Sequence, residues 1–186
     1  MKSKKSIFDA FVNLRSKKEL RKITVKELCE KALINKSTFY TYYEDMFDLS
    51  DKIESEVVDG IVSTISNPQM MIDEPVKFYR SLLGAVSENK KLIDTVFSGS
   101  QHPNLIVKIS KSLKKMTFEN HPEYINDKKI CTILDYAIYG GYYAFVENQE
   151  NTNDYSDELI ESVSVISEHM TKLIKASIPT LKSNNT

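Results

Sequence analysis

The chain has 186 residues, of which 41% are apolar and 27% are charged, and its formal net charge is −1. This composition is ordinary for a globular protein and argues against extensive disorder, while the length allows one large domain or two modest ones. The sequence has no apolar run of signal-peptide length and no stretch of the roughly 20 apolar residues that a membrane span needs, so we expect a soluble, cytoplasmic protein.

The first predicted helix runs from about Lys5 to Lys18 and has one broad apolar face. That face consists of Ile7, Phe8, Phe11, Val12 and Leu14. Residues 1–5 before it form a basic arm, which suits either contact with phosphate or the minor groove, or a solvated tail. We expect the helix to pack across the next two helices and complete a three-helix unit.

A short second helix is predicted from about Val25 to Ala32. Thr24 and Glu27 form a capping box, in which the hydroxyl accepts the backbone N–H three residues on and the carboxylate reaches back to the cap. The apolar residues recur at i, i+3, i+4 and i+7, which is the pattern of a surface helix with one narrow apolar face. They are Val25, Leu28, Cys29 and Ala32.

A third helix follows after a sharp turn. Asn35 is the next good N-cap, and only Leu33 and Ile34 separate it from the second helix. In the third helix Phe39 and Tyr43 lie one turn apart on the same face. The outward residues are hydrogen-bond donors that suit phosphate oxygens and base edges, namely Lys36, Ser37, Tyr40 and Thr41.

This arrangement matches the geometry that places a recognition helix in the major groove of DNA. The charge agrees, because residues 1–43 carry a net charge of +7 and residues 44–186 a net charge of −8. A clustered positive charge is the electrostatic footprint of phosphate binding. The alternatives are two amphipathic helices of an ordinary bundle and a basic face that is merely solvated.

Residues 23–49, ITVKELCEKALINKSTFYTYYEDMFDL, resemble the N-terminal DNA-binding segment of the TetR family of transcriptional regulators. Residues 24–32 match the family's support helix, residues 35–43 match its recognition helix, and its next helix opens near the Asp48–Leu49 pair. The resemblance covers about the first third of the chain closely and the rest only by architecture. It implies a three-helix helix-turn-helix domain over residues 1–48 and a helical effector-binding and dimerisation domain over residues 49–186.

The DNA-contacting residues that follow from this reading are Thr24, Lys26, Lys36, Ser37, Thr38, Tyr40, Thr41 and Tyr42. Two departures from the family pattern stand out. The family usually has glycine where this chain has Leu33, so the turn must either avoid positive φ or accept strain. The family also commonly has lysine at the positions of Glu44 and Met46, where a cation would meet a phosphate.

Beyond the motif, apolar periodicity predicts six more helices and no strand, which gives an all-α fold of about nine helices. The helices span about residues 46–65, 75–88, 90–97, 104–118, 127–147 and 156–176, with loops at 66–74 and 148–155 and a disordered tail after Pro179. The helix over 46–65 begins beside the recognition helix and is expected to link it to the second domain.

The helix over residues 127–147 is apolar around most of its circumference, which suggests burial against its own domain and against a second subunit. Gly140 and Gly141 in mid-helix fit the close approach of another helix, and a kink is the alternative. In the TetR family the last two long helices form a four-helix dimer interface. The resemblance therefore implies a homodimer through helices 127–147 and 156–176, bound to a near-palindromic operator.

The resemblance also implies an effector pocket in the second domain, for a small apolar or aromatic molecule with few polar groups. Its expected lining is Phe78, Tyr79, Phe97, Met116, Tyr136, Tyr139 and Tyr143, although each ring also suits an ordinary core. A ligand that favours one spacing of the recognition helices would shift the DNA-competent population through the 46–65 helix.

We expect no catalytic site, metal site or cofactor. His102, His121 and His169 lie in separate segments, and no glycine-rich phosphate-binding loop occurs. Cys29 and Cys131 are far apart on apolar faces and are expected to be buried free thiols. The sequence thus predicts a DNA-binding regulator, with repression as the family's usual mode. The alternative is a TetR-like dimer that has lost operator binding and acts as a coregulator through a protein partner.

Overall fold

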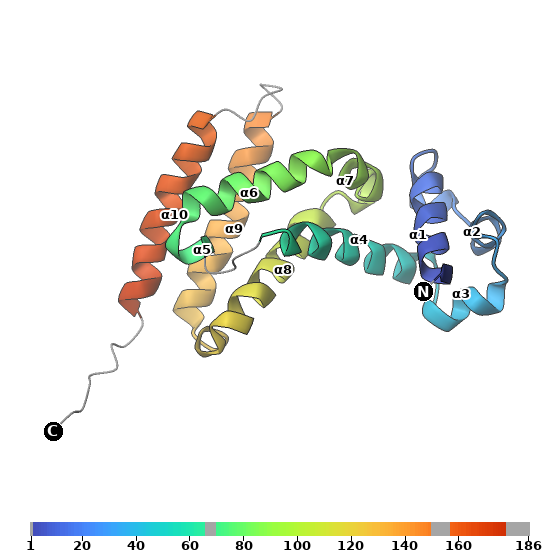
Figure 1. Cartoon of the computed structure of the whole chain (residues 1–186), viewed down its shortest axis with the longest axis horizontal. Coiled ribbons are helices and arrows are strands. Elements are labelled where there is room, and N and C mark those ends of the chain that lie inside the picture. Colours follow the sequence, from blue (N-terminus) through green and yellow to red (C-terminus); the bar gives the residue numbers. More distant parts are fainter. Residues whose placement is uncertain (1, 66–69, 150–156, 178–186) are drawn as a thin grey trace. The chain divides into compact units, whose positions relative to one another are not determined.

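The computed structural model describes residues 2–65, 70–149 and 157–177, and all regular structure in these ranges is helical (Figure 1). This part of the chain contains nine helices of seven residues or more, together with α5, which is a single turn. The predicted all-α fold of about nine helices is therefore confirmed. The helices are α1 (Lys2–Arg15), α2 (Val25–Ala32), α3 (Lys36–Tyr42), α4 (Met46–Ser63), α5 (Met70–Asp73), α6 (Pro75–Glu88), α7 (Lys90–Val96), α8 (Asn104–Asn120), α9 (Lys128–Gln149) and α10 (Asp157–Ser177).

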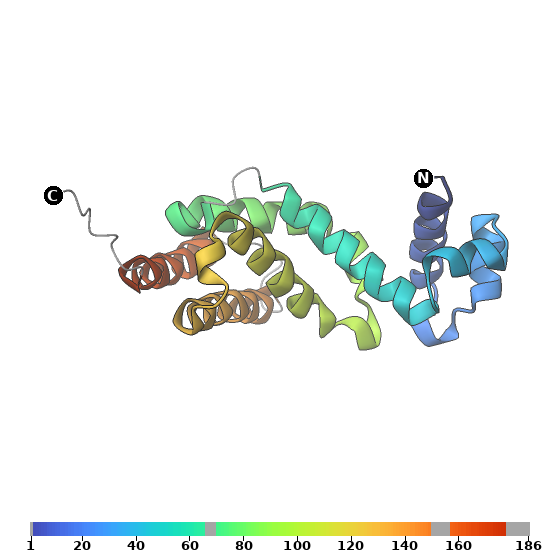
Figure 2. The same ribbon diagram turned by 90° about the horizontal axis from the view of Figure 1, so that it is seen from below.

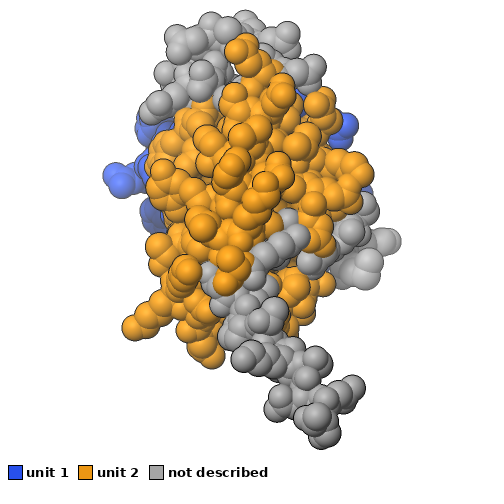
Figure 3. All heavy atoms as spheres, turned by 90° about the vertical axis from the view of Figure 1, so that its left-hand side faces the viewer, with its two compact units in different colours: residues 1–64, 85–109 blue, residues 65–84, 110–186 orange. Residues whose placement is uncertain are grey.

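The chain divides into two compact units, which Figure 3 shows in different colours. Unit 1 consists of Met1–Thr64 and Ala85–Ile109, and unit 2 of Ile65–Gly84 and Ser110–Thr186. Unit 1 thus contains α1 to α4 and α7, while α5, α9 and α10 belong to unit 2. The functional division into residues 1–48 and 49–186 stays a prediction.

In unit 1, α1 packs against α2 and α7 through an apolar face that includes Ile7, Phe11 and Leu14, all buried. The helix begins at Lys2, so residues 2–5, which were expected to belong to a separate arm, form its first turn. Lysine and serine are acceptable at exposed helix positions, which is why apolar periodicity alone placed the start too late. The helix also ends at Arg15, before the predicted Lys18.

Arg15 ties the end of α1 to the end of α7. Its side chain is buried, with only 4% of the residue exposed. The guanidinium donates to the carbonyl oxygen of Lys18 at 3.1 Å and to the carbonyl oxygen and the hydroxyl of Ser98 at 2.9 and 2.6 Å. Its Nη2 also lies 3.5 Å from the carbonyl oxygen of Val96, the last residue of α7, and such helix-end carbonyl groups lack partners within the helix.

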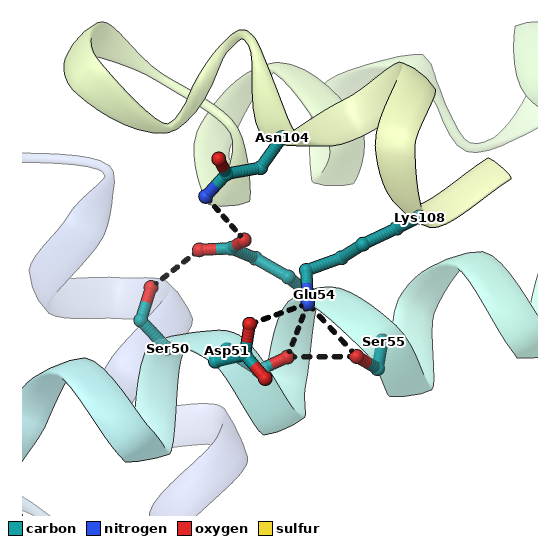
Figure 4. Close-up of polar contacts among 6 residues, drawn as sticks. All are labelled: Ser50, Asp51, Glu54, Ser55, Asn104 and Lys108. Carbon is teal, nitrogen blue, oxygen red and sulfur yellow. Dashed lines mark hydrogen bonds and ion pairs between the residues drawn. The ribbon is translucent and has the colours of Figure 1, made fainter. Parts of the chain in front are cut away.

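Two sets of polar contacts hold α4 against the first turns of α8 (Figure 4). Glu54, which is 1% exposed, accepts hydrogen bonds from Ser50 Oγ at 2.8 Å and Asn104 Nδ2 at 3.1 Å. Lys108 Nζ donates to Asp51 Oδ1 at 2.7 Å and to Ser55 Oγ at 2.9 Å. A buried carboxylate is costly without partners, so these bonds favour one position of α4. That position matters because α4 follows directly after α3.

In unit 2, α9 and α10 lie side by side and run antiparallel, as Figures 1 and 2 both show. Tyr79 of α6 approaches them, and its hydroxyl accepts a hydrogen bond from Ser167 Oγ at 3.0 Å. A Cβ atom at Gly141 would lie 3.4 Å from the same hydroxyl, whereas one at Gly140 would have nothing within 4 Å. A Cβ atom at Gly141 would thus make ordinary van der Waals contacts, and one at Gly140 would lie in open space, so the close approach of another helix does not require glycine at either position.

Two expectations for this part of the chain were wrong. Residues 70–73 were assigned to a loop but form α5, which contacts α10. Met71 of that turn packs against a core cluster formed by Tyr124, Ile130, Leu134 and Ile174, so apolar burial stabilises a turn too short to show periodicity. Cys131 is only half-buried, unlike Cys29, and both are free thiols. Within the described ranges, no helix is both long and apolar enough to cross a membrane.

Candidate nucleic-acid interface

The N-terminus of α2 is capped as predicted, but only by half of the expected capping box. The hydroxyl of Thr24 accepts the backbone N–H of Glu27 at 3.2 Å. The carboxylate of Glu27 does not serve the cap and pairs instead with Lys18 Nζ at 2.5 Å. A cation within reach is a stronger partner for a carboxylate than a second backbone amide. The pair also ties α2 to the segment that leads out of α1.

The turn between α2 and α3 is built on Leu33, which adopts a left-handed conformation with φ 55° and ψ 44°. Leu33 N–H donates to Glu30 O at 3.4 Å, and Ile34 N–H donates to Cys29 O at 3.0 Å. This pair of bonds is a Schellman motif, which usually has glycine at the left-handed position. The turn therefore keeps the geometry typical of glycine and accepts the strain of a branched residue there.

The N-terminus of α3 is organised by one oxygen atom. Asn35 Oδ1 accepts hydrogen bonds from the backbone N–H of Thr38, from the Thr38 hydroxyl and from the Ser37 hydroxyl, each at 2.7 Å. The predicted N-cap at Asn35 is thus confirmed. Because three donors converge on it, the cap defines both where α3 begins and how the side chains of its first turn point.

The two faces of α3 are also as predicted. Phe39 and Tyr43 are buried, with 0% and 8% of each residue exposed. Lys36 and Thr41 are exposed, as is Tyr40, of which 57% is accessible. Among the described residues, Lys36 has no carboxylate partner within ion-pair distance. The helix therefore presents an unpaired cation and an aromatic ring to solvent.

The serine and threonine hydroxyl groups of α3 donate to the helix and its N-cap in this structure. Ser37 and Thr38 donate to Asn35, and Thr41 Oγ1 donates to the carbonyl oxygen of Ser37 at 2.9 Å. Ser37 and Thr41 were expected to be outward donors, but both have an acceptor nearby in the chain. Short hydroxyl side chains in helices commonly bond to such local groups.

The remaining residues predicted to contact DNA lie around α3. Thr24 and Lys26 of the α2 segment are exposed, and Lys26 forms only a long surface pair with Glu30 at 3.9 Å. Tyr42 is half-buried at the end of α3. Lys4 of α1 lies over its ring, with Nζ 5.5 Å from the centroid. Lys4 was not among the predicted contact residues, because nothing in the sequence indicates that the first turn of α1 reaches the end of α3.

The start of α4 is acidic, and it contains Met46, one of the two positions noted above for the absence of a lysine. Met46 is buried, so a lysine there would have to emerge from the core. Asp45 caps the helix, with Oδ1 accepting the N–H groups of Phe47 and Asp48 at 2.8 Å. Asp48 accepts from Glu44 N–H at 2.9 Å and from Lys52 Nζ at 2.8 Å. Backbone amides at a helix N-terminus can bind a phosphate, but here the chain's own carboxylates already engage them.

The ionisation states near α3 follow from these contacts. The hydrogen bond from Lys52, together with the one from Glu44 N–H, holds the pKa of the Asp48 carboxyl below its ordinary value. Burial raises the pKa of the Cys29 thiol, and the nearby Lys36 cation only partly offsets this effect. Burial likewise raises the pKa of the Tyr43 phenol. At neutral pH Asp48 is thus anionic, while Cys29 and Tyr43 are neutral.

Comparison with known proteins finds a similarity to a DNA-binding class. Over 53 residues, which are 28% of this chain, the sequence is 30% identical to an uncharacterized HTH-type transcriptional regulator, YxbF, of Bacillus subtilis (strain 168). The matched stretch covers 14% of that protein, so the similarity concerns a small part of it. No family model matches the sequence, and no solved structure is significantly similar to it.

The seven residues expected to line an effector pocket are divided between the two units. Phe97 belongs to unit 1, whereas the other six belong to unit 2. Phe78 is almost fully buried at 1% exposed, but Tyr136 and Tyr143 of α9 are 66% and 53% exposed. Two surface hollows in unit 1, of about 710 and 580 Å³, are lined by none of the seven. The pocket stays a prediction.

The described ranges contain no candidate metal site. No group of three or more His, Cys, Asp or Glu side chains in these ranges is arranged to hold a metal ion. Unit 1 therefore contributes one coherent candidate site, which is the exposed face of α3 with its neighbours from α1 and α2.

Proposed function

We propose that this chain is a transcriptional regulator that binds double-stranded DNA by placing α3 in the major groove. The observation that carries the proposal is the capped pair α2 and α3, joined by a left-handed turn at Leu33, with Lys36, Tyr40 and Thr41 exposed on α3. A short capped helix of this kind, supported from behind by a second one, is the helix-turn-helix arrangement. The similarity to an HTH-type regulator supports the same function.

The proposal extends to a TetR-like homodimer. We define the outer stripe as Tyr136 and Tyr143 of α9 with Ile166 and Leu173 of α10, all between 51% and 66% exposed. Within each helix the two residues are seven apart, so they share one face. Single exposed apolar residues are normal, but a set on two adjacent helices is typical of an interface. Gly140, with open space around its Cβ position, lies between the two tyrosines of α9 on that face.

A C₂ dimer through the outer stripe would present two copies of α3 to one duplex. Such a dimer requires a near-palindromic operator, with half-sites separated by about one helical turn or a multiple of it. Regulation would follow the TetR pattern, in which a small effector changes operator affinity and repression is the usual outcome. A ligand that binds tightly yet leaves operator affinity unchanged would exclude that mode of regulation.

The acidic start of α4 favours a second candidate function. The amides of Phe47 and Asp48 are capped by Asp45, and the carboxylate of Asp48 stands beside them. A helix N-terminus in this state repels phosphate. In this second function the chain keeps its fold and its dimer but does not bind an operator. It acts instead as a coregulator through a protein partner.

The deciding experiment is selection of random duplex DNA by the purified full-length protein at moderate salt. The proposed function predicts enrichment of a near-palindromic sequence, bound with an affinity that falls steeply as the salt concentration rises. If a folded dimer enriches no sequence, operator binding is excluded and the coregulator function replaces it.

A further inference from the structure

The exposed face of α3 has an unusual set of chemical groups. Asn35 Oδ1 already accepts three hydrogen bonds, so its amide cannot form the paired contact that an asparagine makes with adenine. The helix itself, KSTFYTY, contains no Arg, Asn, Gln, Asp or Glu. Of the residues that usually read single bases through paired hydrogen bonds, the helix contains only one lysine, Lys36.

What remains on this face is largely apolar. The hydroxyl of Thr41 is turned back to the carbonyl oxygen of Ser37 at 2.9 Å, and Thr41 is exposed, so its γ-methyl group is left for a partner. Tyr40 is 57% exposed and meets Phe39 edge-on, with ring centroids 5.3 Å apart. Phe39 is fully buried and therefore supports the Tyr40 ring from the core.

Most of the hydrogen-bonding groups that remain available on this face are acceptors. The hydroxyl protons of Ser37 and Thr41 are engaged within the helix, but each oxygen still has lone pairs that can accept a hydrogen bond. Lys36 supplies one ammonium group, and the Tyr40 phenol supplies one O–H. An interface of this kind offers methyl and ring surface together with acceptor oxygens, and few donors.

The apolar part of this face matches only one type of base pair. In the major groove an A·T pair presents the thymine methyl group beside the amino group of adenine, which is a donor. A G·C pair also presents an amino donor, on cytosine, together with two acceptor atoms on guanine, but it lacks the methyl group. We propose that α3 reads A·T pairs, with the Thr41 methyl group and the Tyr40 ring contacting thymine methyl groups. This inference rests on the proposed DNA-binding function and assigns Tyr40 and Thr41 as its specificity-determining residues.

The test uses the duplex enriched by selection and removes one thymine methyl group at a time. Each thymine of one half-site is replaced by uracil, which leaves all hydrogen-bonding groups unchanged. Burial of one methyl group corresponds to about a fourfold change in affinity. We expect a loss of about fourfold at the thymine that Thr41 faces, and no loss at thymines outside the half-site.

The Thr41→Ser variant identifies the contact. Serine keeps the hydroxyl but lacks the methyl group, so uracil replacement should cost this variant nothing further at the faced position. Thr95→Ser is the matched control, because Thr95 Oγ1 makes the same bond to the carbonyl oxygen four residues earlier, Lys91 O, at 2.7 Å on α7. That control should lose about fourfold on uracil replacement, as the unmodified protein does.

The outcomes separate this inference from the function on which it rests. Salt-sensitive binding to an enriched duplex, with no effect of uracil at any position or with a G·C-rich half-site, overturns the A·T readout and leaves DNA binding intact. Absence of any sequence enrichment overturns both. Equal uracil losses in the unmodified protein and in Thr41→Ser would exclude Thr41 as the methyl-contacting residue.

Discussion

The backbone N–H of Ile34 donates to the carbonyl oxygen of Cys29 at 3.0 Å, across a turn that leaves Leu33 in the left-handed conformation. This bond closes α2 and sets the short separation between α2 and α3. The side chain of Leu33 contributes nothing to it, because the residue is 91% exposed. The turn is therefore maintained by its neighbours, at the expense of strain in one residue.

Leu33→Gly should stabilise the protein. A left-handed conformation costs a branched L-residue about 1–2 kcal/mol, and glycine avoids most of that cost, although it loses more chain entropy on folding. We expect the free energy of unfolding to rise by roughly 1 kcal/mol in a denaturant titration. Leu33→Val is the matched control and should be destabilising, because a β-branched residue is less tolerant of positive φ. No gain for the glycine variant would show that the strain is absent in solution.

Changes at Asn35 should separate stability from DNA binding. Asn35→Ala removes the acceptor of three hydrogen bonds and should cost about 1 kcal/mol of stability. Asn35→Asp keeps the acceptor and should retain the stability, but it adds a negative charge beside Lys36 and should weaken DNA binding. Thermal unfolding and a DNA titration on the same samples measure both effects. Full DNA affinity of the aspartate variant would mean that the first turn of α3 does not approach the duplex.

Lys36 should contribute equally to the affinity for every DNA sequence. Lys36→Gln removes one phosphate-directed cation, so affinity should fall for all duplexes and the slope of log affinity against log salt should become shallower by about 1. Lys111→Gln, at an exposed lysine of α8, is the control with the same change in charge. Titrations at several salt concentrations distinguish the two. Identical slopes for both variants would remove Lys36 from the interface.

Glu44→Lys should increase DNA affinity. It places a cation between α3 and α4, and Glu44 is exposed, so the new side chain does not need to enter the core. Binding should tighten for all duplexes and become more dependent on salt. Glu88→Lys makes the same change in charge at an exposed position of α6 and controls for net charge. Equal effects from the two variants would attribute the gain to net charge and not to the position beside α3.

Ile166→Glu should dissociate the proposed dimer. Ile166 is 56% exposed on the outer stripe of α10, and a charge in an apolar interface is costly to bury. Val107→Glu is a matched control, because Val107 of α8 is also 56% exposed but lies outside the stripe. Sedimentation velocity across a concentration series should give a monomer for the first variant and an unchanged dimer for the second. A dimer in both cases would place the subunit interface elsewhere.

Local sequence signals predicted the helix-turn-helix segment well. Thr24 and Asn35 were expected as N-caps and are observed as N-caps, because a cap depends on residues within three positions of it. Phe39 and Tyr43 were expected to be buried on one face, and both are. The left-handed turn was one of two conformations considered for Leu33. The Schellman bonds decide between them, and they require the chain to continue into α3.

Local sequence signals could not predict contacts between distant segments of the chain. Glu27 pairs with Lys18 in preference to its own cap, and Lys4 lies over the ring of Tyr42. Neither partner is adjacent in sequence, and periodicity says nothing about which side chains meet across helices. For the same reason the sequence could not show that Phe97 belongs to a different unit from the other predicted pocket residues.

The sequence by itself determined the all-α class, the helix caps, the buried face of α3 and the basic character of the N-terminal region. These follow from short-range hydrogen bonding and from apolar spacing, which depend only on neighbouring residues. The tertiary structure alone decided which donors remain available on α3, how the acidic start of α4 is arranged, and which residues of α9 and α10 stay exposed. These depend on how helices pack, and packing brings together residues that the sequence keeps apart.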